Sequence, residues 1–315
     1  MLIIHSPRCL EYAAPGHPER PDRVRSAATA LAQGSHTWLT PEPCSDEDIL
    51  RVHTAAHLES VKRGDFADAD TPNFPNIYEL ARLAAGAAIL AAESATATAP
   101  AFSLMRPPGH HAERDRVMGF CYFNNIAIAA AKVLENVGAP FRARSASDGP
   151  VANSVAPGRA LLQHAKPAKV AILDFDCHHG NGTEDIFRGD DRVLFVSLHQ
   201  SPCYPGTGLD SQQNIVNYPL PPGTGEKQFL ATLDEALKKI EAFEPTLLAV
   251  SAGFDAYKRD PITQMGLEVE TFGAIGARLK TFCAGTLPSF AVLEGGYARD
   301  LADCIVAFVN GWEGL

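Results

Sequence analysis

The segment DFDCHHG at 174–180 carries side chains that could hold a metal ion. If the backbone stays extended, alternation directs Asp174, Asp176 and His178 to the same side. Carboxylate and imidazole ligands without a thiolate suit zinc, iron(II) or manganese, and three protein ligands leave a position open for water, as in catalytic sites. The same pattern is also compatible with a capping and salt-bridge network at a strand end.

Three further motifs contribute reactive side chains. Asp255 in SAGFDA could supply the next metal ligand, with Gly253 permitting close backbone approach, although an aspartate here could also be a helix N-cap. His110 and His111 follow a rigid RPPG turn and suit proton transfer, the alternative being an exposed loop. Tyr297 follows two glycines and could stabilise an oxyanion or simply be a packed aromatic.

The elements that must position these residues alternate between two patterns. Short apolar, β-rich runs predict strands at 2–5, 101–105, 169–175, 192–198, 246–252 and 289–295. Amphipathic or Ala-rich stretches predict helices that include 77–94, 124–137, 226–243, 269–283 and 301–309. This alternation is typical of an α/β fold in which a mainly parallel sheet is covered by helices on both faces.

Five of the predicted strands run directly into polar clusters: MRPPGHH at 105–111, DFDCHHGNG at 174–182, SLHQ at 197–200, SAGFDA at 251–256 and LEGGY at 293–297. In parallel sheets ligands bind beyond the carboxyl ends of the strands, so we expect these clusters to converge. We interpret 1–315 as one catalytic domain. The stretch 140–168 is unusually long for a helix-to-strand connection, and we predict that it is a surface insertion.

Composition excludes several classes of protein. Of the 315 residues, 46% are apolar and 20% are charged, which is the profile of a globular protein. The net charge of −10 disfavours direct binding to nucleic acid. Seven cysteines without a CxxC pair favour reduced thiols over a disulfide framework. Because no apolar run is long enough for a membrane span and the first residues lack the features of a signal peptide, we expect a cytoplasmic protein.

Together these motifs closely resemble the histone deacetylase family and its bacterial amidohydrolase relatives, particularly the class II branch. The resemblance covers nearly the whole chain and is carried by GHPERPDRV at 16–24, DADTP at 68–72, RPPGHHAERDRVMGFCYFNN at 106–125, ILDFDCHHGNGTEDIF at 172–187, SLHQSPCYPGTG at 197–208, SAGFDAYKRDP at 251–261 and LEGGY at 293–297. It implies one three-layer α/β/α domain of the arginase–deacetylase type. The implied activity is zinc-dependent hydrolysis of an acylated amine, most simply the acetyl-lysine of a protein or peptide, with iron(II) as an alternative metal.

The resemblance also implies roles for individual residues. The metal ligands would be Asp176, His178 and Asp255. Asp174 would orient His110, while His111 would be the general base and acid, with Asn181 as its partner. Tyr297 would stabilise the oxyanion. A structural potassium ion would be bound through Asp174, Asp176, His178, Ser197 and Leu198. Asn181 replaces the aspartate that some branches carry, and the class II branch shares it.

For the substrate channel, the resemblance suggests Gly119, Phe120 and Tyr204 as walls of a narrow apolar tunnel. Asp70 resembles the rim aspartate that binds the substrate backbone. Acetylpolyamine-specific members use a gatekeeper glutamate near the rim, and the matching position here is Ile262. This weakens a polyamine interpretation without excluding it, because Asp65, Asp68 or Glu113 could supply a negative rim.

Alternative functions stay open at this point. An arginase-type relative would need a two-metal DxHxD pattern, and His179 occupies the position of the last aspartate. A non-catalytic module that binds acyl-lysine is disfavoured by the complete set of catalytic residues. An acetylpolyamine or other small-molecule amidohydrolase and a deacetylase of a particular metabolic enzyme share the same chemistry. The physiological substrate and the oligomeric state are not predicted.

Overall fold

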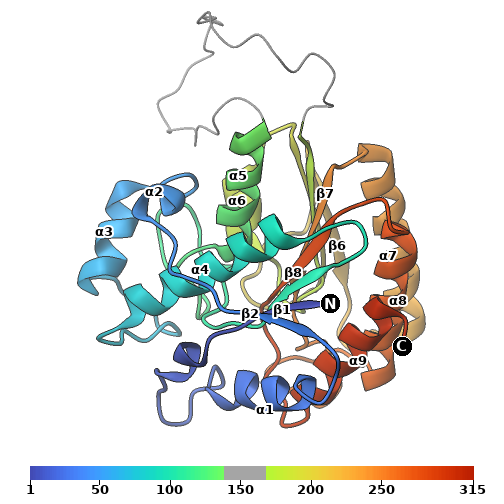
Figure 1. The fold of residues 1–315 in the computed structure, drawn as a ribbon, viewed down its shortest axis with the longest axis horizontal. Coiled ribbons are helices and arrows are strands. Elements are labelled where there is room, and N and C mark those ends of the chain that lie inside the picture. The colour runs from blue at the N-terminus through green and yellow to red at the C-terminus, as the bar shows by residue number, and fades with distance from the viewer. Residues whose placement is uncertain (138–167) are drawn as a thin grey trace, which may run out of the picture.

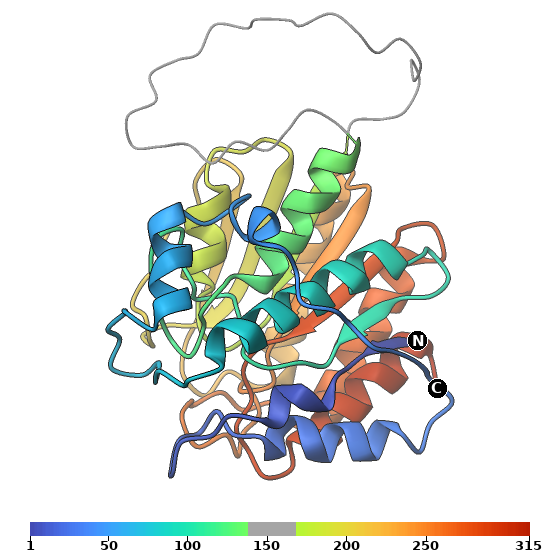
Figure 2. The ribbon, with the colours of Figure 1, turned by 60° about the vertical axis from the view of Figure 1, so that its left-hand side comes forward.

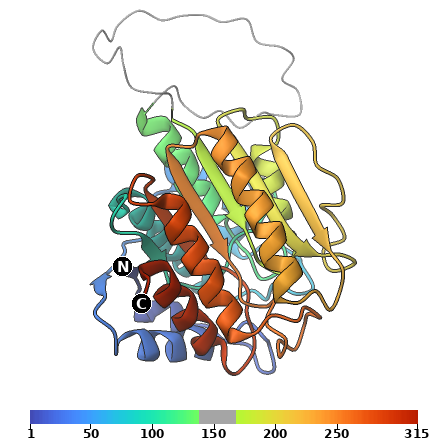
Figure 3. The same ribbon diagram turned by 90° about the vertical axis from the view of Figure 1, so that its right-hand side faces the viewer.

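The computed structural model of the chain describes residues 1–137 and 168–315 (Figure 1). The predicted surface insertion at 140–168 lies, apart from Ala168, outside the described residues. The two ends of the chain lie close together in all three ribbon views (Figures 1 to 3).

One sheet organises the described residues. Its strands are β1 (Leu2–Ile4), β2 (Thr37–Leu39), β3 (Ala101–Ser103), β4 (Val170–Asp174), β5 (Val193–Gln200), β6 (Ile215–Leu220), β7 (Leu247–Ala252) and β8 (Ser289–Leu293). They lie in the order β2-β1-β3-β8-β7-β4-β5-β6, and every pairing is parallel. All strands of the sheet therefore end at the same edge.

Helices cover both faces of this sheet. They are α1 (Asp22–Leu31), α2 (Asp46–Ile49), α3 (Ala55–Arg63), α4 (Ile77–Ser94), α5 (Asn125–Val137), α6 (Asn181–Phe187), α7 (Glu226–Phe243), α8 (Val269–Cys283) and α9 (Leu301–Glu313), with a 3-10 turn, η1, at Pro7–Leu10. Helices α7, α8 and α9 lie on one face, and α4 and α5 lie on the other (Figure 3). α1 packs against α9 rather than directly on the sheet.

The burial of the central strands agrees with their parallel arrangement. Every residue of β3, β4, β5, β7 and β8 is buried, as expected for strands covered on both sides. Gly86 lets α4 approach the segment before α2 closely, because a Cβ at this position would lie 1.9 Å from the carbonyl oxygen of Glu42. The predicted α/β fold class with a parallel central sheet is confirmed.

Several elements were not predicted from the sequence, among them β2, β6 and the helices α1, α2, α3 and α6. β2 is three residues long and largely exposed, and β6 is an edge strand that contains Pro219. Proline in a strand is tolerated at a sheet edge, where the missing N–H breaks no ladder bond. None of the helices in residues 1–137 and 168–315 combines the length and apolar composition that a membrane-spanning helix requires.

Candidate functional site

The polar clusters that follow the strands converge at the carboxyl edge of the sheet. Four neighbouring strands, in the order β3-β8-β7-β4, supply them. The paired histidines follow β3, Tyr297 follows β8, Asp255 follows β7, and the 174–178 segment spans the end of β4. Four of the five predicted clusters therefore lie together, because parallel register aligns the ends of their strands. The fifth, at 197–200, forms the end of β5 itself, next to β4 in the sheet.

Asp176, His178 and Asp255 form the centre of this site. All three are buried, and each offers a ligand atom within 4.8 Å of the other two. Nδ1 of His178 lies 3.1 Å from Oδ1 of Asp176 and 3.0 Å from Oδ2 of Asp255. Burial and the adjacent Asp176 carboxylate raise the pKa of Asp255. Two carboxylates and one imidazole nitrogen thus face the same point in a region shielded from water.

Glycines enclose this group closely. A Cβ at Gly253 would lie 2.1 Å from Oδ2 of Asp176, and a Cβ at Gly295 would lie 2.2 Å from Oδ2 of Asp255. The Gly295 amide also donates a hydrogen bond to Asp176 Oδ2 (2.7 Å), and the Cys177 amide donates one to Asp255 Oδ1 (2.8 Å). The carboxylates are therefore held in place by the backbone, and their oxygen and nitrogen donor set fits zinc, iron(II) or manganese.

The structure also decides between alternatives that the sequence left open. Asp255 is not a helix N-cap, because the next helix begins at Val269 and is capped by Glu268. The two histidines do not lie in an exposed loop, since His110 is 2% exposed and His111 is 4% exposed. Cys177 is directed away from the site, where its thiol faces Oε1 of Gln200 at 3.9 Å.

The two histidines have different partners. Nδ1 of His110 lies 3.0 Å from Oδ2 of Asp174, and Nδ1 of His111 lies 2.7 Å from Oδ1 of Asn181. Their rings are in contact in a tilted arrangement, with centroids 4.0 Å apart and an angle of 40° between the planes. The expected pairs of His110 with Asp174 and of His111 with Asn181 are thus brought into hydrogen-bond contact.

These environments separate the pKa values of the two imidazoles. Burial would lower the pKa of His110, but the carboxylates of Asp176 and Asp174 raise it to about 10. Burial and the neighbouring His110 and His178 lower the pKa of His111 well below its usual range. The neighbouring carboxylates therefore favour the protonated form of His110, whereas the surroundings of His111 favour its neutral form.

Tyr297 is buried beside the same carboxylates. Burial raises the pKa of its phenol, Arg23 opposes this, and Asp255 and Asp176 add to the increase. The Tyr297 amide donates to Oδ2 of Asp260 (2.7 Å), and the Arg23 guanidinium lies 4.6 Å from the centre of the ring. The phenol therefore keeps its proton at neutral pH and can donate a hydrogen bond.

A buried ionic network that sequence reasoning missed supports the loops that carry His110, His111 and Tyr297. Arg106, which precedes the histidine loop, donates to both carboxylate oxygens of Glu19 (2.6 and 2.5 Å). Arg23 donates to the same carboxylate (3.1 Å) and to the carbonyl oxygens of Glu294 and Gly296 in the loop before Tyr297. Glu19 and Arg23 lie in GHPERPDRV, but nothing in that motif indicates contacts with residues 87 and 273 positions away.

A second missed residue is Glu294, which is fully buried. Its Oε2 accepts hydrogen bonds from the amides of Gly109 (2.7 Å) and His110 (3.1 Å). Burial raises the pKa of this carboxyl group to about 7. Glu294 thus links the end of β8 to the backbone of the histidine loop, and its position in LEGGY was the only sequence signal for it.

Aromatic rings lie next to the candidate catalytic residues. Tyr204 is 38% exposed, and its ring lies 5.3 Å from that of His111 and 6.2 Å from that of His178. Phe120 contacts Tyr297, with ring centroids 5.7 Å apart. A Cβ at Gly119 would lie 2.5 Å from the ring of His111. Gly119, Phe120 and Tyr204 therefore all border His111 or Tyr297.

The rim residues are more peripheral. Asp70 and Ile262 are both exposed. The carbonyl oxygen of Asp70 lies 3.1 Å from Nε2 of His17, whose ring contacts Phe120 at 4.7 Å. The Ile262 amide donates to Oδ1 of Asp260 (3.1 Å). Both residues are connected to the site through the backbone, and their roles toward a substrate stay predictions.

Phe120 has an unusual backbone conformation. Its φ is 70°, and that of Gly119 before it is 56°, both in the left-handed region. The Phe120 amide donates a hydrogen bond to Oγ1 of Thr71 (2.9 Å). This bond contributes to holding the ring in its place beside Tyr297.

Residues of the predicted potassium site lie next to one another. Asp174 in β4 is the register partner of Ser197 in β5. Oδ1 of Asp174 accepts the Asp176 amide (3.0 Å), and Oδ1 of Asp176 accepts the His178 amide (2.9 Å). Leu198 is buried beside Ser197. The structure brings this set together, and potassium binding stays a prediction.

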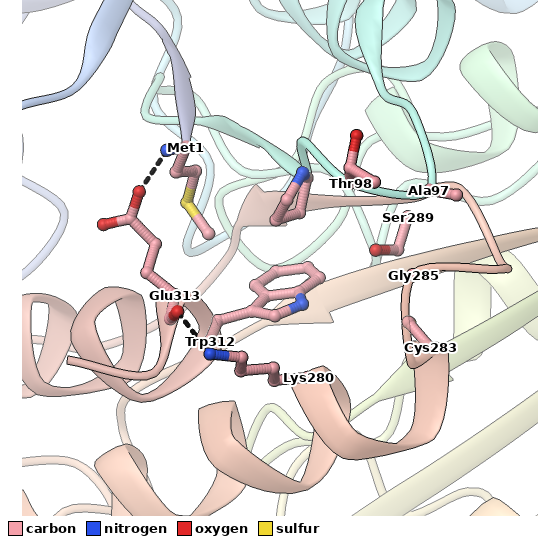
Figure 4. Close-up of a pocket in the computed structure, with 10 residues that line it drawn as sticks. Met1, Ala97, Thr98, Lys280, Cys283, Gly285, Ser289, Trp312 and Glu313 are labelled. Atoms are coloured by element: carbon pink, nitrogen blue, oxygen red, sulfur yellow. Dashed lines mark hydrogen bonds and ion pairs between the residues drawn. The ribbon is translucent and has the colours of Figure 1, made fainter.

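A separate cavity lies away from this chemistry. Its volume is about 330 Å³, and it lies at the start of β1, where Met1, Lys280, Trp312 and Glu313 line it (Figure 4). The Met1 amine pairs with the Glu313 carboxylate, and Lys280 donates to the Glu313 carbonyl oxygen. None of the metal-ligand candidates contributes to this cavity.

Comparison with known proteins identifies the family. The sequence profile described as "Histone deacetylase domain" matches residues 17–140 and 151–312. The chain is 37% identical to a "Probable deacetylase" from Methanothermobacter thermautotrophicus, over 100% of this chain and 91% of that protein. It is 36% identical to a "Histone deacetylase-like amidohydrolase" from Pseudomonas aeruginosa, over 96% of this chain and 78% of that protein.

The fold comparison agrees. The crystal structure of an acetylpolyamine aminohydrolase from Burkholderia pseudomallei matches with a TM-score of 0.82 and 28% identity, covering 99% of this chain and 98% of that one. The chain therefore belongs to the histone deacetylase family of hydrolases. The family resemblance inferred from the motifs is confirmed.

Proposed function

We propose that this chain is a zinc-dependent amidohydrolase that removes the acetyl group from Nε-acetyl-lysine in proteins or peptides. The observation that carries the proposal is the convergence of Asp176, His178 and Asp255 with the buried side chains of His111 and Tyr297 at one edge of the sheet. Family membership supports hydrolysis of an acylated amine. The metal, the residue roles and the substrate are the parts that we propose.

The three ligand candidates would hold a divalent cation. When bound, such a cation polarises an amide carbonyl and lowers the pKa of its water to about 7. Zinc and iron(II) both suit a site of two carboxylates and one imidazole. A side chain at position 253 or 295 would collide with the carboxylate of Asp176 or Asp255, so glycine at these positions lets the two ligands keep their places.

The remaining residues would transfer protons and stabilise the negative charge that develops during the reaction. His111 is neutral, so its Nε2 can take a proton from the attacking water and return it to the departing amine. Nδ1 of His110 pairs with the Asp174 carboxylate, and the His110 ring lies against the ring of His111. The phenol of Tyr297 would donate a hydrogen bond to the oxyanion that develops from the carbonyl.

The approach to the site favours an aliphatic stem. Phe120 and Tyr204 present rings beside Tyr297 and His111, so a lysine side chain can pass between apolar surfaces. Ile262, 40% exposed, offers no charge to a polyamine. For this reason we favour acetyl-lysine over an acetylpolyamine, although the matching aminohydrolase fold makes the polyamine the natural competitor in an assay.

The proposal is tested with a panel of acetyl-lysine peptides, longer acyl-lysine peptides and acetylated polyamines. Each is assayed with zinc, with iron(II) and after chelation. We expect the highest kcat/KM on acetyl-lysine peptides and loss of turnover on chelation that zinc restores. Preference for acetylpolyamines would contradict the substrate assignment, and turnover that survives complete chelation would contradict the mechanism.

The role of His111 in proton transfer is tested by substitution. His111→Ala should abolish most turnover, because a general acid and base contributes on the order of 10² to 10⁴ in rate. Its metal content should stay near that of the unmodified protein, since His111 is not a proposed ligand. Full activity in this variant would refute the assignment of His111.

A further inference from the structure

A carboxylate lies directly behind the pair of His111 and Asn181. Oε1 of Glu113 accepts a hydrogen bond from Nδ2 of Asn181 at 2.7 Å. Its other oxygen pairs with the Arg116 guanidinium at 2.7 Å. The side chain of Glu113 is only 18% exposed. The sequence suggested Glu113 as a rim charge for substrate, but its carboxylate is engaged with Asn181 instead.

The orientation of the Asn181 amide matters because its two ends have opposite hydrogen-bonding character. The oxygen only accepts and the NH₂ group only donates, while the two ends have nearly the same shape. Near Nδ2 lie three acceptors: Oε1 of Glu113, Sδ of Met118 at 3.3 Å and the carbonyl oxygen of His111 at 3.5 Å. Of these, the Glu113 oxygen is closest and charged, and a carboxylate cannot donate to a flipped amide.

The orientation of this amide decides which nitrogen of His111 carries the proton. Because Oδ1 of Asn181 can only accept, the hydrogen bond of 2.7 Å requires a proton on Nδ1 of His111. The lone pair then lies on Nε2, the nitrogen that does not contact Asn181. A flipped amide would donate to Nδ1 and favour a proton on Nε2, which could not accept another.

Backbone hydrogen bonds hold Glu113 and Asn181 in place relative to each other. The Glu113 amide donates to the Arg116 carbonyl oxygen (3.1 Å), and the Glu113 carbonyl oxygen lies 3.0 Å from Nδ1 of the buried His53. At the start of α6, the amides of Gly182 and Thr183 donate to the His110 carbonyl oxygen (3.0 and 3.2 Å). The segment that carries Glu113 and the helix that begins with Asn181 are therefore fixed relative to each other.

We propose that Glu113 is a positioning residue: it fixes the amide orientation of Asn181 and thereby keeps Nε2 of His111 free to accept a proton. Its relevance to catalysis rests on the proposed function, but its effect on the tautomer does not. Asn181 alone could hold His111 in either tautomer. Some branches place a carboxylate directly beside the histidine. Here the amide of Asn181 takes that place, and the carboxylate of Glu113 contacts the far end of the amide.

Nitrogen-15 NMR of histidine-labelled protein tests the tautomer without any activity measurement. Long-range proton–nitrogen correlations distinguish Nδ1–H from Nε2–H, and the His111 signals are assigned from their loss in a His111→Asn variant. The unmodified protein should show the Nδ1–H form. Glu113→Ala should add a substantial Nε2–H population, and a pure Nδ1–H pattern in that variant would overturn the proposal.

A double-mutant cycle tests the consequence for turnover. Glu113→Ala should lower kcat by a factor of roughly 10 to 100, in line with the loss of one charge-assisted hydrogen bond, and leave KM unchanged. In an Asn181→Asp background, both oxygens at position 181 accept, so no orientation has to be selected. There, Glu113→Ala should leave kcat unchanged or raise it, because it removes a like charge next to Asp at 181.

The cycle separates positioning from a structural role. Equal losses of kcat in both backgrounds would show that Glu113 acts only on the fold and would refute the proposal. Asp115→Asn is the matched control, because it removes the same charge from an exposed position in the same loop, and its kcat should stay unchanged. If no acyl substrate is turned over by the unmodified protein, the proposed function fails, while the NMR result still decides the tautomer.

Discussion

Glu19→Gln should destabilise the fold through the two arginines that share this carboxylate. Glu19 is 3% exposed and accepts hydrogen bonds from Arg106 (2.6 and 2.5 Å) and Arg23 (3.1 Å). Removing one partner of a buried ion pair costs about 3–5 kcal/mol, because the remaining charge is left uncompensated. Glutamine keeps the volume and one acceptor oxygen, so we expect the lower end, about 3 kcal/mol at pH 7.

The stability lost in Glu19→Gln should depend on pH in a defined direction. Burial alone would raise the pKa of Glu19, but Arg106 and Arg23 hold it below its ordinary value of 4.5. A lowered pKa means that the ionised carboxylate contributes its full stability above pH 4.5 and loses it as pH falls through the pKa of the folded protein. The difference between the unmodified protein and Glu19→Gln should therefore be largest near neutral pH and shrink in acid.

Urea unfolding followed by far-ultraviolet circular dichroism measures this difference at pH 7 and at several lower pH values. Glu11→Gln is a suitable control, because Glu11 is 44% exposed and its pair with Arg8 is solvated. It should change the free energy of unfolding by less than about 1 kcal/mol. A loss of this small size for Glu19→Gln at pH 7, or a difference that does not narrow in acid, would refute the reasoning.

Three further substitutions probe the site. Tyr297→Phe should lower kcat by about 10²- to 10³-fold with unchanged metal content, because it removes one oxyanion donor and keeps the ring; full turnover would exclude that role. Asp255→Asn should retain much less metal after dialysis, measured by plasma emission, and retention equal to the unmodified protein would remove Asp255 from the ligand set. Ile262→Glu should raise the kcat/KM ratio of acetylpolyamine to acetyl-lysine peptide by about five-fold, as expected for one exposed charge, and an unchanged ratio would place residue 262 outside the rim.

The sequence predicts the long helices and the central strands well. Helices α4, α7 and α8 have the expected bounds, because each shows a clear helical periodicity over 15 to 18 residues. α6 is harder to predict, since its seven residues overlap the polar motif that follows β4. The edge strand β6 was missed because it contains Pro219, and a proline within a short run argues against a strand.

The centre of the site was predictable because its residues follow strand ends in recognisable motifs. Parallel strands bring such ends together whatever their separation in the chain. The supporting residues follow no such rule. The contacts of Glu19 with Arg106 and of Asn181 with Glu113 join residues 87 and 68 positions apart in the chain. Their existence depends on how loops fold over the sheet edge, which no local pattern encodes.

The left-handed backbone at Phe120 sets two selective pressures against each other. A bulky residue in this region costs on the order of 1–3 kcal/mol, which glycine would avoid. The aromatic ring, however, is the surface that lies against Tyr297. Directed evolution that screens only for heat resistance would therefore tend to replace this phenylalanine by glycine, and a screen that also demands turnover would retain the phenylalanine.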